Sequence, residues 1–173
     1  MATGGRVLRA GAPADVMLVI GGASVGDRDV LRAVIGDLGG TILFDRIAVQ
    51  PGKPSWHARL GDGRLVLGLP GNPASAFVCA VLLLRPLIEA MLGRTARGPS
   101  FARLSTALEA PGERETYWRA RVASDSSGQA IVTPFASRDS SLQRPLANAN
   151  ALLRQPAGTA LSAGATVEIV TLD

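Results

Sequence analysis

The chain has 173 residues, of which 47% are hydrophobic and 18% charged, so it is able to bury a core and is not disordered throughout. Its net charge of +4 comes mainly from dispersed arginines, and aromatic residues make up only 4%. A nucleic-acid surface is therefore weakly supported, and a small anionic ligand explains the charge equally well.

The first part of the chain predicts a β-loop-α-β unit. Residues 15–20 form a short apolar run that ends at Gly21-Gly22 and is typical of a buried parallel strand. Residues 29–38 carry apolar side chains at helical spacing, and a glycine pair follows as a C-terminal stop. Residues 41–49 are the next predicted strand.

A hairpin and a helix follow. Residues 56–60 and 64–69 are predicted strands joined by Gly61-Asp62-Gly63, a strong turn signal. The following helix begins near Pro73, with Asn72 as its cap, and runs to about Leu92. This helix is apolar nearly all round, so we expect it to be central and buried.

Composition changes at residues 93–100, which are polar, rich in breakers and typical of a linker. Beyond it, short predicted strands recur between turns, which indicates a small all-β barrel or sandwich. They cover residues 101–108, 116–123, 130–133 and 166–172. We therefore expect an α/β domain over residues 1–95 and an all-β domain over residues 96–173. Residues 1–95 supply fewer βα units than a doubly wound sheet needs, so the sheet is either incomplete or completed by another chain.

Cellular location is predicted only from absences. Residues 1–6 do not resemble a secretory signal. The longest apolar run, Ala74–Leu84, has 11 residues, which as a helix extends about 16 Å and falls short of a bilayer core of about 30 Å. We expect a soluble cytoplasmic protein. The single cysteine, Cys79, excludes an internal disulfide and is expected to be a small buried hydrophobe.

Three loops have the chemistry of an anion site. The loop Gly21–Gly26 lies between a predicted strand and a predicted helix, where backbone N–H groups bind phosphate and Ser24 adds a donor. Lys53 lies between a glycine and a proline and is suited to an oxyanion, while Asn72 and Ser75 frame a second helix start. The alternatives are a tight βα turn, an exposed turn lysine and ordinary capping by Asn72.

Acidic and basic side chains suggest further contacts. Asp27 and Asp29 are candidate Mg²⁺ ligands near phosphates, or else first-turn acids that match the helix dipole. In the β part, Arg114 and Arg119 bracket an aromatic pair and Ser140-Ser141 follow a turn. By themselves these four are unremarkable strand and surface residues.

Five motifs in this order resemble the molybdopterin molybdenumtransferase family, which comprises bacterial molybdenum insertases and the related domain of gephyrin. They are GGASVGDRD at 21–29, QPGKP at 50–54, LPGNPAS at 69–75, RETYWRA at 114–120 and SSLQRPLANANALL at 140–153. The combination of PGKP with LPGNPxS is highly specific for the family, and the resemblance covers nearly the whole chain.

The resemblance implies insertion of molybdenum from molybdate into adenylylated molybdopterin, with release of AMP and a need for Mg²⁺. It implies part of a pterin-binding α/β domain followed by a β-barrel domain. The implied catalytic residues are Asp29, Lys53 and Ser75, and Asp27 and Asp29 are the implied metal ligands. The implied ligand-binding residues are Gly21, Gly22, Ser24, Gly26, Pro54, Pro70, Gly71, Asn72 and Pro73, with Arg114 or Arg119 and Ser140 or Ser141 in the second domain.

Two departures from the family qualify this expectation. Gln50 and Arg46 stand where many members have lysine. The N-terminal elements of the family are also missing, including the region that forms homodimers, so we expect the isolated chain to lack full activity. The alternative function is a non-catalytic scaffold module that binds molybdopterin or a protein partner.

Overall fold

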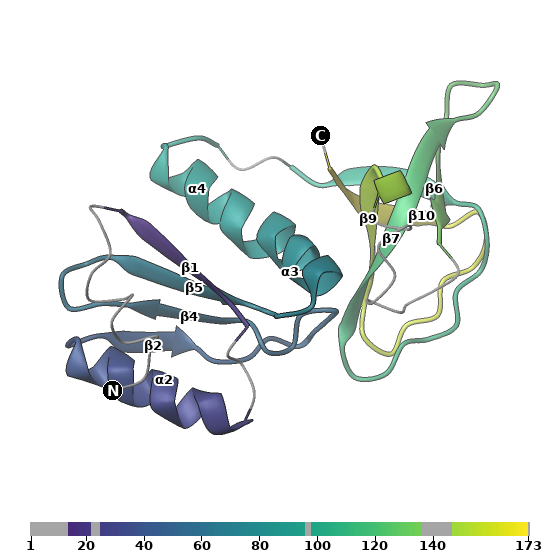
Figure 1. The fold of residues 1–173 in the computed structure, drawn as a ribbon. Helices are drawn as coiled ribbons and strands as arrows, with labels where there is room; N and C mark the ends of the chain where they lie inside the picture. The colour runs from purple at the N-terminus through teal and green to yellow at the C-terminus, as the bar shows by residue number, and fades with distance from the viewer. Residues whose placement is uncertain (1–13, 22–24, 96–97, 136–146, 173) are drawn as a thin grey trace. The chain divides into compact units, whose positions relative to one another are not determined.

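The computed structural model describes residues 14–21, 25–95, 98–135 and 147–172 (Figure 1), and side chains 25–29 lie outside the description. The chain divides into two compact units, one of residues 1–47 and 52–79, the other of residues 48–51 and 80–173. Residues 48–51 and 80–95 thus group with the second unit, while the domain boundary after residue 95 stays a prediction.

The first unit is built on a four-stranded sheet in the order β1-β5-β4-β2. Its strands are β1 (Val16–Ile20), β2 (Thr41–Phe44), β4 (Trp56–Arg59) and β5 (Leu65–Leu69). β1 runs parallel to β5, as its continuous apolar sequence predicts, and the other two pairings are antiparallel. Helix α2 (Val25–Asp37) packs on one face of the sheet, around the buried residues Ile35, Trp56, Ala58, Leu60 and Val66.

Glycines end the elements of this unit where the sequence predicts. Gly39 has φ of 64°, and the N–H of Gly40 donates to the carbonyl of Ile35 at 2.9 Å, so α2 ends in a Schellman-type cap. Gly63, with φ of 90°, lies in the turn that joins β4 to β5. In the same turn the Asp62 carboxylate accepts a 2.7 Å hydrogen bond from Arg64 Nε. The predicted hairpin is confirmed.

The strand predicted over residues 41–49 is wrong, because this segment is divided between the two units. β2 ends at Phe44 after a register irregularity between Ile42 and Phe44. Residues 49–50 form a separate strand, β3 (Val49–Gln50), which pairs in parallel with the barrel strand β7. The charged pair Asp45-Arg46 interrupts the apolar pattern directly after β2, and this interruption was a local signal of the break.

The predicted apolar helix exists but is not buried along its length. It consists of α3 (Pro73–Cys79), a π-helical turn at Ala80–Leu84 and α4 (Arg85–Met91). The π turn lies just ahead of Pro86, which has no N–H to donate and whose ring crowds the preceding turn. Only α3 contains buried side chains, whereas Phe77, Ile88 and Met91 are at least 40% exposed.

The membrane argument made from sequence also fails on length. The helical segment Pro73–Met91 has 19 residues because it continues past Arg85 and Pro86, so by length and composition alone it is able to cross a membrane. Core helices of soluble proteins meet the same criterion. The cytoplasmic location therefore stays a prediction.

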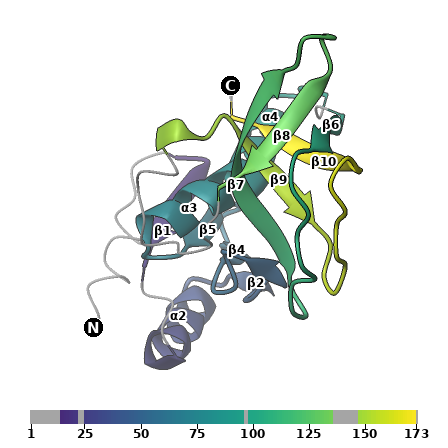
Figure 2. The same ribbon diagram turned by 90° about the vertical axis from the view of Figure 1, so that its right-hand side faces the viewer.

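The second unit contains a closed five-stranded barrel (Figure 2). Its strands are β6 (Ser100–Leu104), β7 (Glu115–Ser124), β8 (Ala130–Pro134), β9 (Ala151–Gln155) and β10 (Thr166–Thr171). The sheet order β7-β8-β6-β10-β9 closes when β9 pairs back with β7, and β3 adds beside β7. The expected α/β unit followed by a small β-barrel is therefore confirmed, although β9 is absent from the predicted strands.

The barrel core is a cluster of apolar side chains with a buried amide beside it. Its buried residues are Ala102, Leu104, Trp118, Ala120, Val132, Leu153, Val167 and Ile169. Gln155 is fully buried beside them, where its Oε1 accepts a 2.8 Å bond from Trp118 Nε1. Its Nε2 donates to the carbonyls of Glu109 and Thr159, both at 2.9 Å. All the polar atoms of this amide are thus satisfied inside the barrel.

Candidate functional site

Two of the three predicted ligand loops meet in the first unit. β1 and β5 are adjacent parallel strands, so the loops that follow them leave from the same end of the sheet. The N–H of Gly21 donates to the carbonyl of Leu69 at 3.0 Å, and a Cβ built on Gly71 would lie 3.3 Å from the Cα of Gly21. Glycine at both positions lets the two backbones approach closely, at the end of a sheet where α/β proteins bind ligands.

Asn72 and Ser75 shape the start of α3 at the same place. Asn72 Oδ1 accepts bonds from the Ser75 N–H at 3.1 Å and from the Ser75 hydroxyl at 3.2 Å. Pro70 and Ser75 are buried, while Gly71 and Pro73 are exposed. Ordinary capping by Asn72 is therefore present. The catalytic role of Ser75 stays a prediction, and its hydroxyl is already bonded to the cap.

The loop that carries Lys53 is fixed by its backbone. The N–H of Ile47 donates to the carbonyl of Lys53 at 3.2 Å, and that of Ser55 donates to the carbonyl of Gly52 at 2.9 Å. Lys53 is exposed and Pro54 half-buried. The loop therefore holds the backbone in place while the ammonium group remains in solvent.

The two candidate arginines of the barrel differ in burial. Arg119 is 6% exposed, whereas Arg114 is half-buried, just ahead of β7. β3 places Gln50, the first residue of the QPGKP motif, opposite Thr116, two residues from Arg114. Within the second unit, the start of one predicted site motif thus lies beside another. Ser140 and Ser141 lie outside the described residues.

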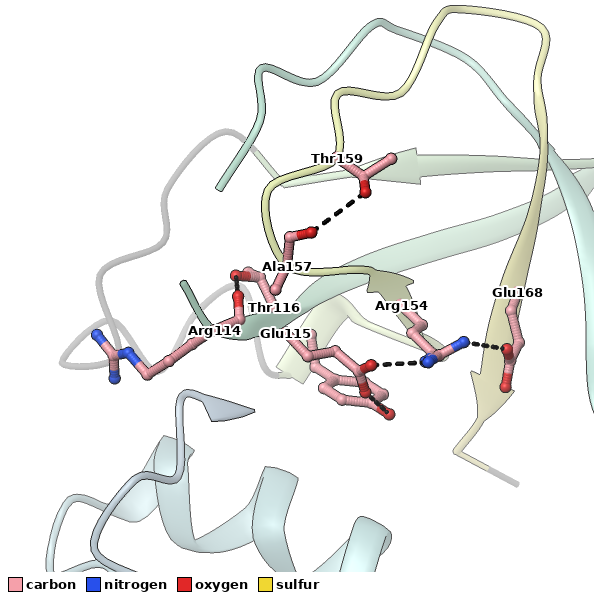
Figure 3. Close-up of polar contacts among 8 residues, drawn as sticks. Arg114, Glu115, Thr116, Arg154, Ala157, Thr159 and Glu168 are labelled. Atoms are coloured by element: carbon pink, nitrogen blue, oxygen red, sulfur yellow. Dashed lines mark hydrogen bonds and ion pairs between the residues drawn. The ribbon is translucent and has the colours of Figure 1, made fainter. Parts of the chain in front are cut away.

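Next to Arg114, the opposite side of β7 carries an ion-pair network that sequence reasoning missed (Figure 3). Arg154 bonds Glu115 at 2.7 Å and Glu168 at 2.9 Å, and the Tyr117 hydroxyl donates to Glu115 at 2.7 Å. The available signal was the spacing of Glu115 and Tyr117, because alternate residues of a strand share a face. Figure 3 shows the Arg114 side chain extending away from this network.

The network shifts the ionisation of its members in opposite directions. The hydrogen bond from Arg154 holds the pKa of the Glu115 carboxyl below its usual 4.5, with a smaller contribution from Tyr117. Burial, followed by the neighbouring Glu115 carboxylate, raises the pKa of Tyr117. Glu115 therefore contributes stability above pH 4.5 that is lost as the pH falls through its lowered folded-state pKa.

The magnesium role of Asp27 and Asp29 stays a prediction, because their side chains lie outside the described residues. Asp27 and Asp29 fall inside α2 rather than before it. Residues 22–24, which include the predicted ligand residues Gly22 and Ser24, also lie outside the description. Among the described residues there is no group of three or more His, Cys, Asp or Glu able to hold a metal ion.

Cys79 has the structural role expected from the sequence. It is fully buried in α3, and burial raises the pKa of its thiol, an effect that a hydrogen bond with Ser55 partly opposes. Such a thiol is a poor nucleophile at neutral pH.

Fold and site together define an α/β protein with glycine loops at the ends of parallel strands, followed by a closed β-barrel. Residues 2–90 match the family "Probable molybdopterin binding domain", and residues 102–172 match "MoeA C-terminal region (domain IV)". The chain belongs to the molybdopterin molybdenumtransferase family, as the five sequence motifs predict.

Named relatives agree with this assignment. The molybdopterin molybdenumtransferase of Bacillus subtilis is 33% identical over 161 residues, which cover 91% of this chain and 37% of the relative. That of Staphylococcus aureus is 30% identical over 90% of this chain and 38% of the relative. A crystal structure of the molybdopterin biosynthesis MoeA protein of Pyrococcus horikoshii superposes with a TM-score of 0.75 at 28% identity, covering 96% of this chain and 39% of that one. The chain thus spans under two-fifths of the length of these relatives.

Proposed function

We propose that this chain acts in molybdenum cofactor biosynthesis as part of a molybdopterin molybdenumtransferase, which inserts molybdenum from molybdate into adenylylated molybdopterin and releases AMP. The observation that carries the proposal is the close approach of Gly21 and Gly71 at the ends of two adjacent parallel strands. It creates a surface of small residues at the ends of the two strands, which lets the phosphates of a pterin nucleotide approach the main chain.

The candidate residues are assigned to the two substrates by their chemistry. The Gly21 and Gly71 loops hold the nucleotide, and the exposed Lys53 supplies a positive charge. Of the two barrel arginines we assign the half-buried Arg114 to the tetrahedral molybdate dianion, because Arg119 is 6% exposed. Fixed donors of this kind stabilise charge as it develops in the reaction.

Magnesium enters the proposal only as a requirement implied by the family. Mg²⁺ is commonly held by one or two carboxylates together with substrate phosphate oxygens and water. We assign Asp27 and Asp29 to the ion, as the resemblance implies, and derive no step from it.

The Gly71→Ala variant tests the nucleotide surface. The added methyl group, 3.3 Å from the Cα of Gly21, pushes the two loops apart by a few tenths of an ångström. We expect the affinity for adenylylated molybdopterin, followed by pterin fluorescence, to fall about tenfold or more, since small displacements of a positioned ligand are costly. The matched control is Gly112→Ala, where a Cβ meets nothing within 4 Å.

Equal affinities for Gly71→Ala and Gly112→Ala would contradict the proposed nucleotide surface. The reaction itself is tested by molybdate-dependent AMP release from the adenylylated substrate by the chain alone. Nucleotide binding without AMP release would support the ligand site. It would also indicate that catalysis requires the additional residues of the longer relatives. Binding of a protein partner with neither nucleotide nor molybdate binding would favour the scaffold alternative.

A further inference from the structure

A cavity of about 310 Å³ lies at one end of the β6–β10 ladder, inside the second unit. Its lining consists of Arg85 at the start of α4, residues 98–100 at the start of β6, and residues 168–171 of β10. This volume is at the small end of the range for ligand sites in proteins. No residue that the proposed function assigns to pterin nucleotide or molybdate lines this cavity.

The backbone of β10 is open where it borders the cavity. Its pairing with β6 ends at Ile169. The N–H of Leu172 donates to the carbonyl of Asn150, just ahead of β9, so the backbone groups of Thr171 face the opposite side. On that side Arg85 Nη1 donates to the Thr171 carbonyl at 3.0 Å. The Thr171 N–H points the same way and has no acceptor among the described residues.

Arg85 brings a positive charge to the cavity. Its side chain is half-buried, and the bond to Thr171 uses one N–H of a guanidinium that carries several. Arg85 forms no ion pair with any carboxylate in the part of the chain that the structure describes. Its other donors are therefore free to bond an oxyanion in the cavity, where partial burial strengthens the attraction.

Glu168 brings a negative charge to the wall of the same cavity. Its Oε2 accepts a 2.9 Å bond from Arg154 (Figure 3), while its Oε1 has no partner among the described residues. Arg154 also pairs with Glu115 at 2.7 Å. One guanidinium is thus shared by two carboxylates, so Glu168 retains negative charge and a free acceptor toward the cavity.

The two opposite charges line one cavity without pairing to each other. Each is held by a different bond, Arg85 to the Thr171 carbonyl and Glu168 to Arg154. A simple anion in the cavity would meet the Glu168 carboxylate, and a simple cation would meet Arg85, so like charges oppose both. A molecule that carries a charge of each sign is complementary to both walls at once.

We propose that this cavity binds a small zwitterion of the amino-acid class, whose carboxylate bonds Arg85 and the Thr171 N–H and whose ammonium group bonds Glu168. A carboxylate accepts two parallel bonds from a guanidinium, and an ammonium group has donors for a carboxylate oxygen. Pro99 and Val170 add apolar lining for the carbon chain. The proposal does not depend on molybdenum insertion, because it rests on this cavity alone.

The test titrates the full chain with ω-amino acids of increasing chain length, from glycine to 6-aminohexanoate, and follows the amide NMR signals. The length of the amino acid measures the separation of the two charges in the cavity. We expect one length to bind best, with a Kd of about 1 mM or tighter, and to shift the Thr171 amide signal. The carboxylic acid and the alkylamine of the same length should each bind about tenfold or more weakly, because each leaves one wall charge unpaired.

Arg85→Gln and Glu168→Gln should each weaken binding of the best amino acid by about tenfold or more, because each removes one charge-assisted bond. Arg103→Gln is the first matched control, since Arg103 also bonds a barrel carbonyl. Glu115→Gln is the second, since Glu115 is the other carboxylate paired with Arg154. Neither control residue lines the cavity, so both variants should bind like the unaltered chain. The amide spectrum of each variant checks that it is folded.

Three results would overturn the proposal. The first is that no amino acid of the series shifts the Thr171 amide signal. The second is that the simple carboxylic acid binds as tightly as the amino acid, which would identify a plain anion site without a role for Glu168. The third is that the cavity variants and their controls weaken binding equally. The first two results come from the unaltered chain, so the test stays decisive if a variant does not fold.

Discussion

Gln155 connects separate parts of the barrel interior. It is fully buried, and its side chain joins Trp118 on β7 to the carbonyls of Glu109 and Thr159. A buried amide of this kind is stabilising only while every partner is present, because an unpaired polar group in the interior is costly.

Gln155→Ala should therefore lower the free energy of unfolding by about 3 kcal/mol, since it strands the indole N–H and two carbonyls and leaves a cavity. The measurement is urea unfolding followed by tryptophan fluorescence, to which Trp56 and Trp118 both contribute. Gln129→Ala is the control, because Gln129 is exposed on the β7–β8 turn and should change stability by less than about 0.5 kcal/mol. A similar loss in both variants would show that the Gln155 bonds contribute little.

At the scale of elements, the pairing of β4 with β5 depends on a glycine under a tryptophan. Trp56 lies opposite Gly68, and a Cβ on Gly68 would come within 1.9 Å of the Trp56 indole nitrogen. The indole thus occupies the space that any side chain at position 68 needs. By contrast, Gly36 in α2 has open space around it.

The two glycines should respond to alanine with opposite signs. Gly68→Ala should destabilise the first unit by about 2 kcal/mol or more through overpacking. Gly36→Ala should stabilise it by about 0.5–1 kcal/mol, because alanine loses less backbone entropy in a helix. Thermal unfolding followed by far-ultraviolet circular dichroism measures both. A stable Gly68→Ala variant would mean that Trp56 has room to move.

At the scale of the whole molecule, the two units differ in their sheet edges, because one sheet is closed and the other is open. The barrel closes on itself through the β7–β9 pairing, whereas the sheet of the first unit, within the part of the chain that the structure describes, ends at β1. Closure removes edges altogether, and an open apolar edge favours association.

A fragment of residues 98–173 should accordingly fold alone and unfold cooperatively, because all five barrel strands lie within it. A fragment of residues 1–79 should instead associate as its concentration rises. Circular dichroism melts and analytical ultracentrifugation of both fragments provide the measurement. A barrel fragment without a cooperative transition would show that closure requires β3 or α4.

Sequence by itself determined the local elements and the loops. The glycine stops at 39–40, the hairpin at 61–63 and the strand over Val16–Ile20 follow from backbone freedom and apolar pattern, and all are present. The family assignment also follows from sequence, because its motifs consist of residues that special backbone positions demand.

Tertiary structure alone decided which elements meet. Residues 41–49 divide between two sheets because hydrogen-bond partners, rather than hydrophobicity, assign a short strand. β9 was missed because its Ala-Leu-Leu run has low strand propensity and is held by pairing with β7 and β10. The approach of Gly21 to Gly71, the buried Gln155 bonds and the bond from Arg85 to Thr171 are long-range contacts, which no local pattern of the chain encodes.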